Sequence, residues 1–149
     1  MITPSLRLLA ALALALVSSA CLDIPKASVE DDTQAKAFEA RPDRCGLYVF
    51  RDGSGASNVA LPLDLDGVEL GSTGPRTYLF TWLPVGKHTI SSHTDENARV
   101  RFLAKPGTLV YVRQESEMGF WHFESKLKLV SEAEGQKGVR QCLLAEMAQ

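Results

Sequence analysis

The chain has 149 residues, with 16 lysines and arginines against 18 aspartates and glutamates and a formal net charge of −2. This length suits a single domain with one hydrophobic core. The nearly balanced charge provides no basic stripe, which argues against a nucleic-acid partner.

The first 20 residues have the pattern of a secretory signal peptide. Arg7 precedes an apolar run from Leu8 to Val17, and small residues follow at 18–20. The apolar run is too short to span a bilayer, which needs about 20 residues. We therefore predict that the protein is exported and that residues 1–20 are removed.

Cys21 follows this segment directly, at the position that receives a diacylglycerol in bacterial lipoproteins. Lipidation would also leave Cys45 and Cys142 as an even pair, which an exported protein favours. The small residues at 18–20 equally satisfy ordinary signal peptidase, and that alternative gives a soluble periplasmic protein. We predict lipidation of Cys21. Leu22, where an aspartate would retain the protein in the inner membrane, favours the outer membrane facing the periplasm.

Residues 21–44 are expected to be the lipidated cysteine and a polar tether. Fully extended, residues 22–44 would reach about 75 Å. Thr33 is a candidate cap for a short helix in this segment, and Pro42 would end it. Phe38, at helical spacing, is available to dock on the domain.

From residue 45 to residue 149 the pattern predicts a mainly β domain, a small antiparallel β-sandwich with a C-terminal helix. Turn residues separate short apolar segments throughout this part of the chain. The expected strands cover 46–51, 59–65, 68–71, 77–83, 87–93, 99–104, 108–114, 119–124 and 126–131.

Asp66-Gly67 predicts the clearest hairpin, because both positions of a primed two-residue turn need a positive φ. In this register Leu65 faces Val68, and Leu63 faces Leu70. The hairpin would then cover the core with one apolar face.

The sequence also predicts a central strand and a final helix. The segment 77–83 is apolar on both faces, which predicts a central strand covered on both sides. Apolar residues at helical spacing predict a final helix over Gln136–Met147. The residues on its apolar face are Val139, Cys142, Leu143 and Met147.

Export places the two remaining cysteines in an oxidising compartment, where disulfides persist. We predict a Cys45–Cys142 disulfide that clasps the final helix to the first strand. The alternative is two separate buried thiols.

Several motifs together resemble domain-of-unknown-function family 2846, a family of bacterial lipoproteins. They are Leu47-Tyr48-Val49-Phe50-Arg51, Asp66-Gly67, Gly71, Leu83-Pro84-x-Gly86-x-His88-Thr89 and Tyr111-Val112-Arg113. The stretch from Asp66 to His88 is also similar to the PEGA surface-layer-like module. The resemblance covers about residues 44–131 and implies a transthyretin-like sandwich with no catalytic residues. It highlights Arg51 and Arg113, which either contact a ligand or pair with carboxylates at strand ends.

Chemical motifs are sparse. His88 and His93 fall on opposite faces of one expected strand, His122 lies on another, and no metal-ligand spacing occurs. Asp64-x-Asp66-Gly67 lacks the carboxylates that a calcium loop needs at its first and last positions. There is no nucleophile elbow, phosphate loop or dinucleotide fingerprint. We predict no metal, no cofactor and no enzymatic activity.

The run Phe120-Trp121-His122-Phe123 is the best candidate for a binding surface. Alternation places Trp121 and Phe123 on one face of the expected strand. The alternatives are a core strand buried on both sides, or exposed rings that stack on sugars or anchor a partner.

These observations favour a lipid-anchored protein of the bacterial envelope that acts as a non-catalytic binding or assembly module. Its partners would be the membrane, through the lipid on Cys21, and another envelope protein. The alternatives are a glycan-binding or enzyme-inhibiting periplasmic lipoprotein, and a small hydrolase.

Overall fold

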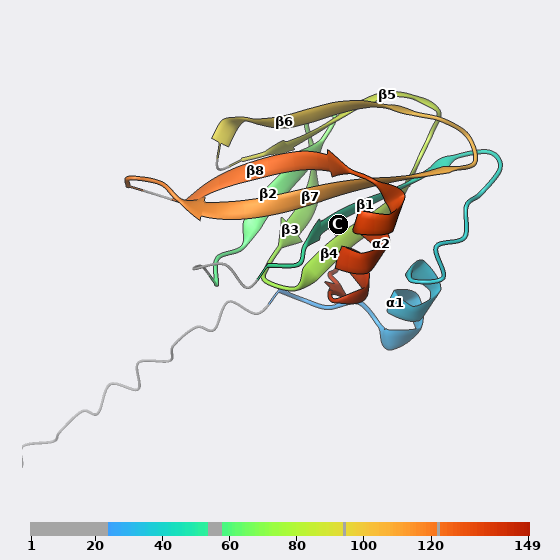
Figure 1. Cartoon of the computed structure of the whole chain (residues 1–149), viewed down its shortest axis with the longest axis horizontal. Coiled ribbons are helices and arrows are strands. Elements are labelled where there is room, and N and C mark those ends of the chain that lie inside the picture. The colour runs from blue at the N-terminus through green and yellow to red at the C-terminus, as the bar shows by residue number, and fades with distance from the viewer. Residues whose placement is uncertain (1–23, 54–57, 94, 122) are drawn as a thin grey trace, which may run out of the picture.

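The computed structural model describes residues 24–53, 58–93, 95–121 and 123–149. The expected signal peptide, residues 1–20, and Cys21 lie outside these ranges. Two β-sheets pack face to face, with two helices beside them (Figure 1). The predicted mainly β sandwich is therefore confirmed.

The five-stranded sheet has the order β8-β7-β1-β4-β9, and the four-stranded sheet has the order β3-β2-β5-β6. The strands of the first sheet are β1 (Cys45–Arg51), β4 (Thr77–Leu83), β7 (Thr108–Met118), β8 (Phe123–Val130) and β9 (Leu143–Leu144). Those of the second are β2 (Leu61–Leu65), β3 (Val68–Thr73), β5 (Gly86–Ser92) and β6 (Asp95–Ala104). The helices are α1 (Val29–Ala35) and α2 (Glu132–Arg140).

β1 is the central strand of the larger sheet. It pairs antiparallel with β4 and parallel with β7, and every one of its residues is buried. Its side chains alternate between two apolar clusters: Leu47 and Val49 face the other sheet, whereas Tyr48 and Phe50 face the helices. β4 has the predicted bounds and lies between β1 and β9. It is buried at Tyr78, Leu79 and Leu83, but Phe80 and Trp82 on its outer face are only partly buried, so the predicted cover on both sides is incomplete.

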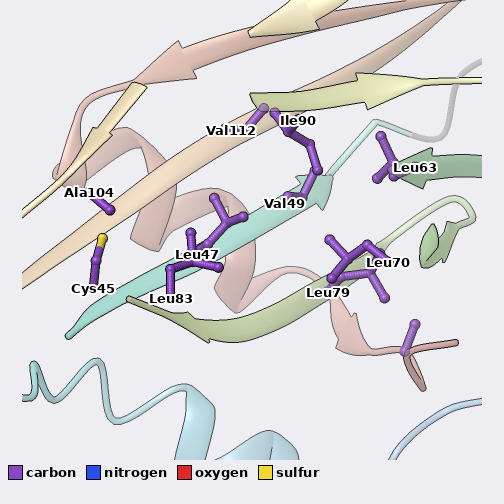
Figure 2. Close-up of a cluster of buried hydrophobic side chains, with 11 residues drawn as sticks. Cys45, Leu47, Val49, Leu63, Leu70, Leu79, Leu83, Ile90, Ala104 and Val112 are labelled. Carbon is purple, nitrogen blue, oxygen red and sulfur yellow. The ribbon is translucent and has the colours of Figure 1, made fainter. Parts of the chain in front are cut away.

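The main core lies between the two sheets (Figure 2). Leu47 and Val49 from β1 and Leu79 and Leu83 from β4 meet Ile90 of the opposite sheet. Burial of such side chains is the dominant stabilising contribution in a sandwich of this size.

The β2–β3 hairpin turns at Asp66 and Gly67, whose φ angles are 53° and 82°. The predicted primed turn is confirmed, and so is the pairing of Leu65 with Val68. The predicted pairing of Leu63 with Leu70 is wrong, because a bulge between Leu63 and Asp64 places Leu63 opposite Gly71. The bulge inserts one extra residue, Leu70, between Gly71, which pairs with Leu63, and Glu69, which pairs with Asp64. Leu63 and Leu70 are both buried.

The second cluster lies on the outer face of the larger sheet, beneath α2 and beside α1. Ser131 caps α2 by accepting a hydrogen bond from the Glu134 backbone, so this helix begins earlier than the predicted 136–147. It ends at Arg140, after which the chain turns into β9. Leu143 and Met147, predicted to face the core, are consequently exposed.

Two glycines allow α2 to approach the sheet closely. A Cβ atom on Gly135 would lie 2.2 Å from Cγ of Tyr111. On Gly138 it would lie 2.1 Å from Cε2 of Phe50. Neither distance is compatible with a side chain, so both positions need glycine for packing.

The segment before β1 is docked on the sandwich instead of forming an extended tether. Its backbone pairs with the C-terminal residues: Ala27 N–H donates to the Leu144 carbonyl and Glu146 N–H donates to the Pro25 carbonyl, both at 2.9 Å. Ser28, not Thr33, caps α1. As predicted, Phe38 packs on the domain.

No helix among the described residues is both long and apolar enough to cross a bilayer.

Candidate functional site

Arg51, predicted as a possible binding residue, is buried at the end of β1 with 1% of its surface exposed. Its guanidinium donates to the Val59 carbonyl at 2.7 Å and to the Ser116 hydroxyl at 2.9 Å. Burial lowers the pKa of Arg51. The side chain thus joins the segment before β2 to β7 and offers little surface to a ligand.

Arg113 also forms internal contacts. Its two terminal nitrogens donate to Glu134 of α2 and to Asp52 after β1, each at 2.8 Å. Its guanidinium carbon lies 5.5 Å from the centre of the Phe50 ring. Of the two interpretations of Arg113, pairing with carboxylates at the end of a strand is the one that the structure bears out.

A hollow of about 460 Å³ lies beside the two arginines. Both guanidiniums make the hydrogen bonds given above, and Asp52, Glu115 and Glu117 also line the hollow. An anionic ligand would meet more acidic than basic side chains there, so this hollow is a poor anion site.

Phe120 and Trp121 lie in the connection between β7 and β8, not in a core strand. The predicted strands 119–124 and 126–131 are one strand, β8, and the chain reverses just before it. Because residues at a turn do not alternate between faces, Phe120 and Trp121 lie together, and each is 87% exposed. Their ring centroids are 4.9 Å apart, edge to face. The side chain of Phe123 and all of His122 lie outside the described part of the chain.

A second aromatic surface was not predicted from the sequence. Tyr48, Phe80 and Trp82 form the floor of a pocket of about 290 Å³ between α1 and the outer face of the larger sheet. Tyr48 and Phe80 have ring centroids 4.5 Å apart, and Phe80 and Trp82 meet edge to face at 5.1 Å. The polar residues around the floor are Asp31, Gln34, Glu39 and Arg41.

The pocket floor is fixed in place. The Tyr48 hydroxyl donates to the Ala35 carbonyl at 2.7 Å, which ties the floor to α1. Burial, and to a lesser extent the neighbouring Tyr111, raise the pKa of Tyr48, so the phenol is neutral at physiological pH. Arg41 covers part of Trp82, with its guanidinium carbon 4.6 Å from the ring centre. A rigid aromatic floor with hydrogen-bonding groups around it suits binding.

This pocket left only a partial signal in the sequence. The order Tyr78-x-Phe80-x-Trp82 places three aromatic rings on one face of a strand, and this pattern predicts a covered face. In the structure α1 covers Tyr78 but leaves Phe80 and Trp82 partly exposed.

Two histidines form carboxylate pairs on the smaller sheet. His88 contacts Asp66 through Nδ1 at 2.6 Å and the Pro84 carbonyl through Nε2 at 2.8 Å. His93 Nε2 lies 2.5 Å from Asp64. Among the described residues, no group of three or more histidine, cysteine, aspartate and glutamate side chains is placed to hold a metal ion.

The pKa values of the first pair shift in opposite directions. Burial by itself would lower the pKa of His88, but hydrogen bonds to Asp66 and Pro84 and the negative charge of Asp66 together raise it above 6.5. Burial by itself would raise the pKa of Asp66, but hydrogen bonds from His88 and the Thr89 backbone lower it below 3.8. Because both neighbours of the imidazole are acceptors, the charged form of His88 fits this arrangement best.

The predicted Cys45–Cys142 disulfide is wrong, because both thiols are free. Cys45 begins β1 and faces the core between the sheets, whereas Cys142 lies in the outer cluster. The Cys142 thiol donates to the carbonyl of Arg51, at the other end of β1, at 3.6 Å. Six residues of strand separate the two ends, which is about 20 Å, whereas a disulfide needs α-carbons within about 7 Å.

The described residues thus define a β-sandwich protein with an aromatic pocket on one face and an aromatic hairpin tip. No family profile matches the chain, and the resemblance to family 2846 stays a prediction. The chain is 30% identical over 134 residues to an uncharacterized protein of Haemophilus influenzae. The alignment covers 88% of this chain and 79% of that protein, so this chain belongs to the same family.

Proposed function

We propose that this protein is a lipid-anchored, non-catalytic binding or assembly module of the bacterial envelope. The lipid on Cys21 holds it at the outer membrane, facing the periplasm. Its partner is another envelope protein, which inserts a side chain or chain end into the aromatic pocket.

The observation that carries this proposal is the aromatic pocket beside α1. Tyr48, Phe80 and Trp82 form its floor, and the sheet and the Tyr48–Ala35 hydrogen bond hold the floor rigid. A pre-formed site costs little ordering entropy on binding. At about 290 Å³ the pocket is large enough for one side chain and small for a whole cofactor.

The anchoring is tested by fractionating cells and labelling them with a fatty acid. Wild-type protein should take up the label and sediment with membranes. Cys21→Ser should take up none and move to the soluble periplasm, because stable anchoring needs the acyl chains. A wild-type protein that is unlabelled and soluble contradicts the proposal.

Binding is tested by site-specific photocrosslinking in intact cells. A crosslinker at Glu39, which lines the pocket, should give a discrete product that Trp82→Ala abolishes. The matched control is a crosslinker at Lys128, an exposed residue of β8, which should give none. Equal products from both positions would show that the pocket has no specific partner.

Glycan binding is the second candidate, favoured by the partly exposed Trp82 ring beside Asp31, Gln34 and Glu39. Sugars stack on such rings while their hydroxyls bond to carboxylates and amides. In a Trp121→Phe background, quenching of Trp82 fluorescence by soluble muropeptides would favour this candidate over a protein partner.

A further inference from the structure

Three large apolar side chains are exposed where β7 ends and the chain turns toward β8. Phe120 and Trp121 are each 87% exposed, and neighbouring Met118 is 65% exposed. The two rings touch each other and project into solvent. Exposure of two such rings is costly in water unless they meet an apolar environment in the cell.

The hairpin projects from one end of the sandwich (Figure 1). β7 runs parallel to β1, and their last pair joins Phe50 to Arg113. β7 then continues for five residues to Met118, which is about 16 Å at 3.3 Å per residue. The tip therefore lies well beyond the end of β1.

The described chain begins at this same end. Ile24 packs against Gly74, and a Cβ on that glycine would lie 2.8 Å from the Ile24 side chain. Gly74 lies in the turn just before Thr77, which pairs with Arg51, the last residue of β1. Ile24 and the hairpin are thus both at the end where β1 stops.

The docking of residues 24–44 makes the distance to Cys21 short. Two residues lie between Cys21 and Ile24, and the three Cα–Cα steps that join them span about 10 Å at most. A lipid on Cys21 would therefore hold this end of the sandwich within about 10 Å of the bilayer. A hairpin that projects about 16 Å from the same end is then within reach of the membrane surface.

We propose that Phe120 and Trp121 insert into the interfacial region of the bilayer that holds the lipid on Cys21. This inference rests on the lipid anchoring proposed above. Aromatic side chains favour this region, where an apolar ring and a polar edge are both accommodated. The tip and the lipid form two points of attachment, which orient the aromatic pocket away from the membrane.

The size and charge of the tip favour a lipid surface over a protein partner. Two rings bury roughly 400 Å², about half of what each side of a stable protein interface buries. Glu115, Glu117 and Glu124 outnumber Lys126 near the tip, and Lys126 already pairs with Glu117 at 2.6 Å. We therefore expect insertion into zwitterionic lipid to be at least as strong as into anionic lipid.

The test uses the full-length acylated protein, purified in detergent and reconstituted into phosphatidylcholine vesicles with or without brominated acyl chains. The chain has two tryptophans, so Trp82→Phe leaves Trp121 as the sole reporter. We expect the brominated lipid to reduce Trp121 emission by roughly twofold or more, as for a ring at the interface. The matched control, Trp121→Phe, leaves Trp82 at the other end of the sheet, and its emission should not change.

Intact mass of the same sample separates the two proposals. If the lipid is present and Trp121 is not quenched, the tip inference is overturned and the anchoring stands. If Cys21 carries no lipid, the anchoring fails and the tip inference fails with it. If muropeptides quench Trp121 and brominated lipid does not, the tip binds glycan and the inference is overturned.

Discussion

Replacing Gly138 with alanine tests how closely α2 packs on the larger sheet. The added Cβ would lie 2.1 Å from Cε2 of Phe50 and 2.7 Å from its Cδ2. Optimal contacts between carbon atoms are about 3.5–4.0 Å. The Phe50 ring is fully buried, so it has no free space into which to move.

The expected free-energy change is the difference between two opposing effects. Alanine is favoured over glycine in a helix interior by about 1 kcal/mol. Overpacking a well-filled core costs about 1–3 kcal/mol, and the clash here is severe. We therefore expect Gly138→Ala to lower the free energy of unfolding by about 1–2 kcal/mol. Helix propensity alone predicts the opposite, an increase in stability.

Urea denaturation of the purified protein measures this change. The matched control is Ala133→Gly, at an exposed position of the same helix, which should cost about 1 kcal/mol from propensity alone. A double-mutant cycle with Phe50→Leu identifies the cause. Because leucine lacks the outer ring atoms, the penalty of Gly138→Ala should shrink in that background.

An increase in stability of about 1 kcal/mol for Gly138→Ala would refute this reasoning, because it would show that the position behaves as an exposed helix site. An unchanged penalty in the Phe50→Leu background would show that the ring is not the obstacle.

Three other predictions follow from contacts described above. Gly67→Val should cost about 1–3 kcal/mol, because φ is 82° there. No atom lies within 4 Å of the Cβ position at residue 67. Because asparagine tolerates a positive φ, Gly67→Asn should cost less than Gly67→Val when the two variants are compared by thermal unfolding. His88→Gln should lower the melting temperature most between pH 3.8 and 6.5. The His88–Asp66 pair stabilises fully there and weakens as pH rises through the raised His88 pKa or falls through the lowered Asp66 pKa. Burial raises the pKa of the Cys142 thiol to about 12. Cys45 and Cys142 are both buried, so both should resist alkylation in the native protein and react in urea without reductant. An intact mass two hydrogens lighter would contradict the free thiols.

Local signals in the sequence predicted much of the fold. Asp66-Gly67 identified its turn correctly because the requirement for positive φ belongs to those two residues. The bounds of β4 were correct because its apolar run is interrupted at both ends. The bulge at Leu63 could not be predicted, because it depends on how the hairpin fits between neighbouring strands.

The other errors came from sequence patterns that carry no information about where residues lie in three dimensions. The even pair of cysteines predicted a bond, but parity contains no information on which face of a sheet each thiol occupies. The helical spacing of the apolar residues from Val139 onward predicted a helix over residues 136–147. The capping residue Ser131, which marks the true start of α2, was not recognised. The pocket at Trp82 depends on where α1 docks, which is a tertiary property that no local pattern of residues encodes.

The pairing of distant segments in the larger sheet has a consequence for the order of folding. Cys45 contacts Thr108, 63 residues later, and Asp32 contacts Leu144, 112 residues later. Such contacts close large loops, and domains dominated by them fold slowly, in milliseconds to seconds. The N-terminal segment cannot dock until Leu144 and Glu146, whose backbone groups pair with Ala27 and Pro25, have been synthesised. A chain that crosses a membrane from its N-terminus would therefore complete this sheet only after β9 has been delivered.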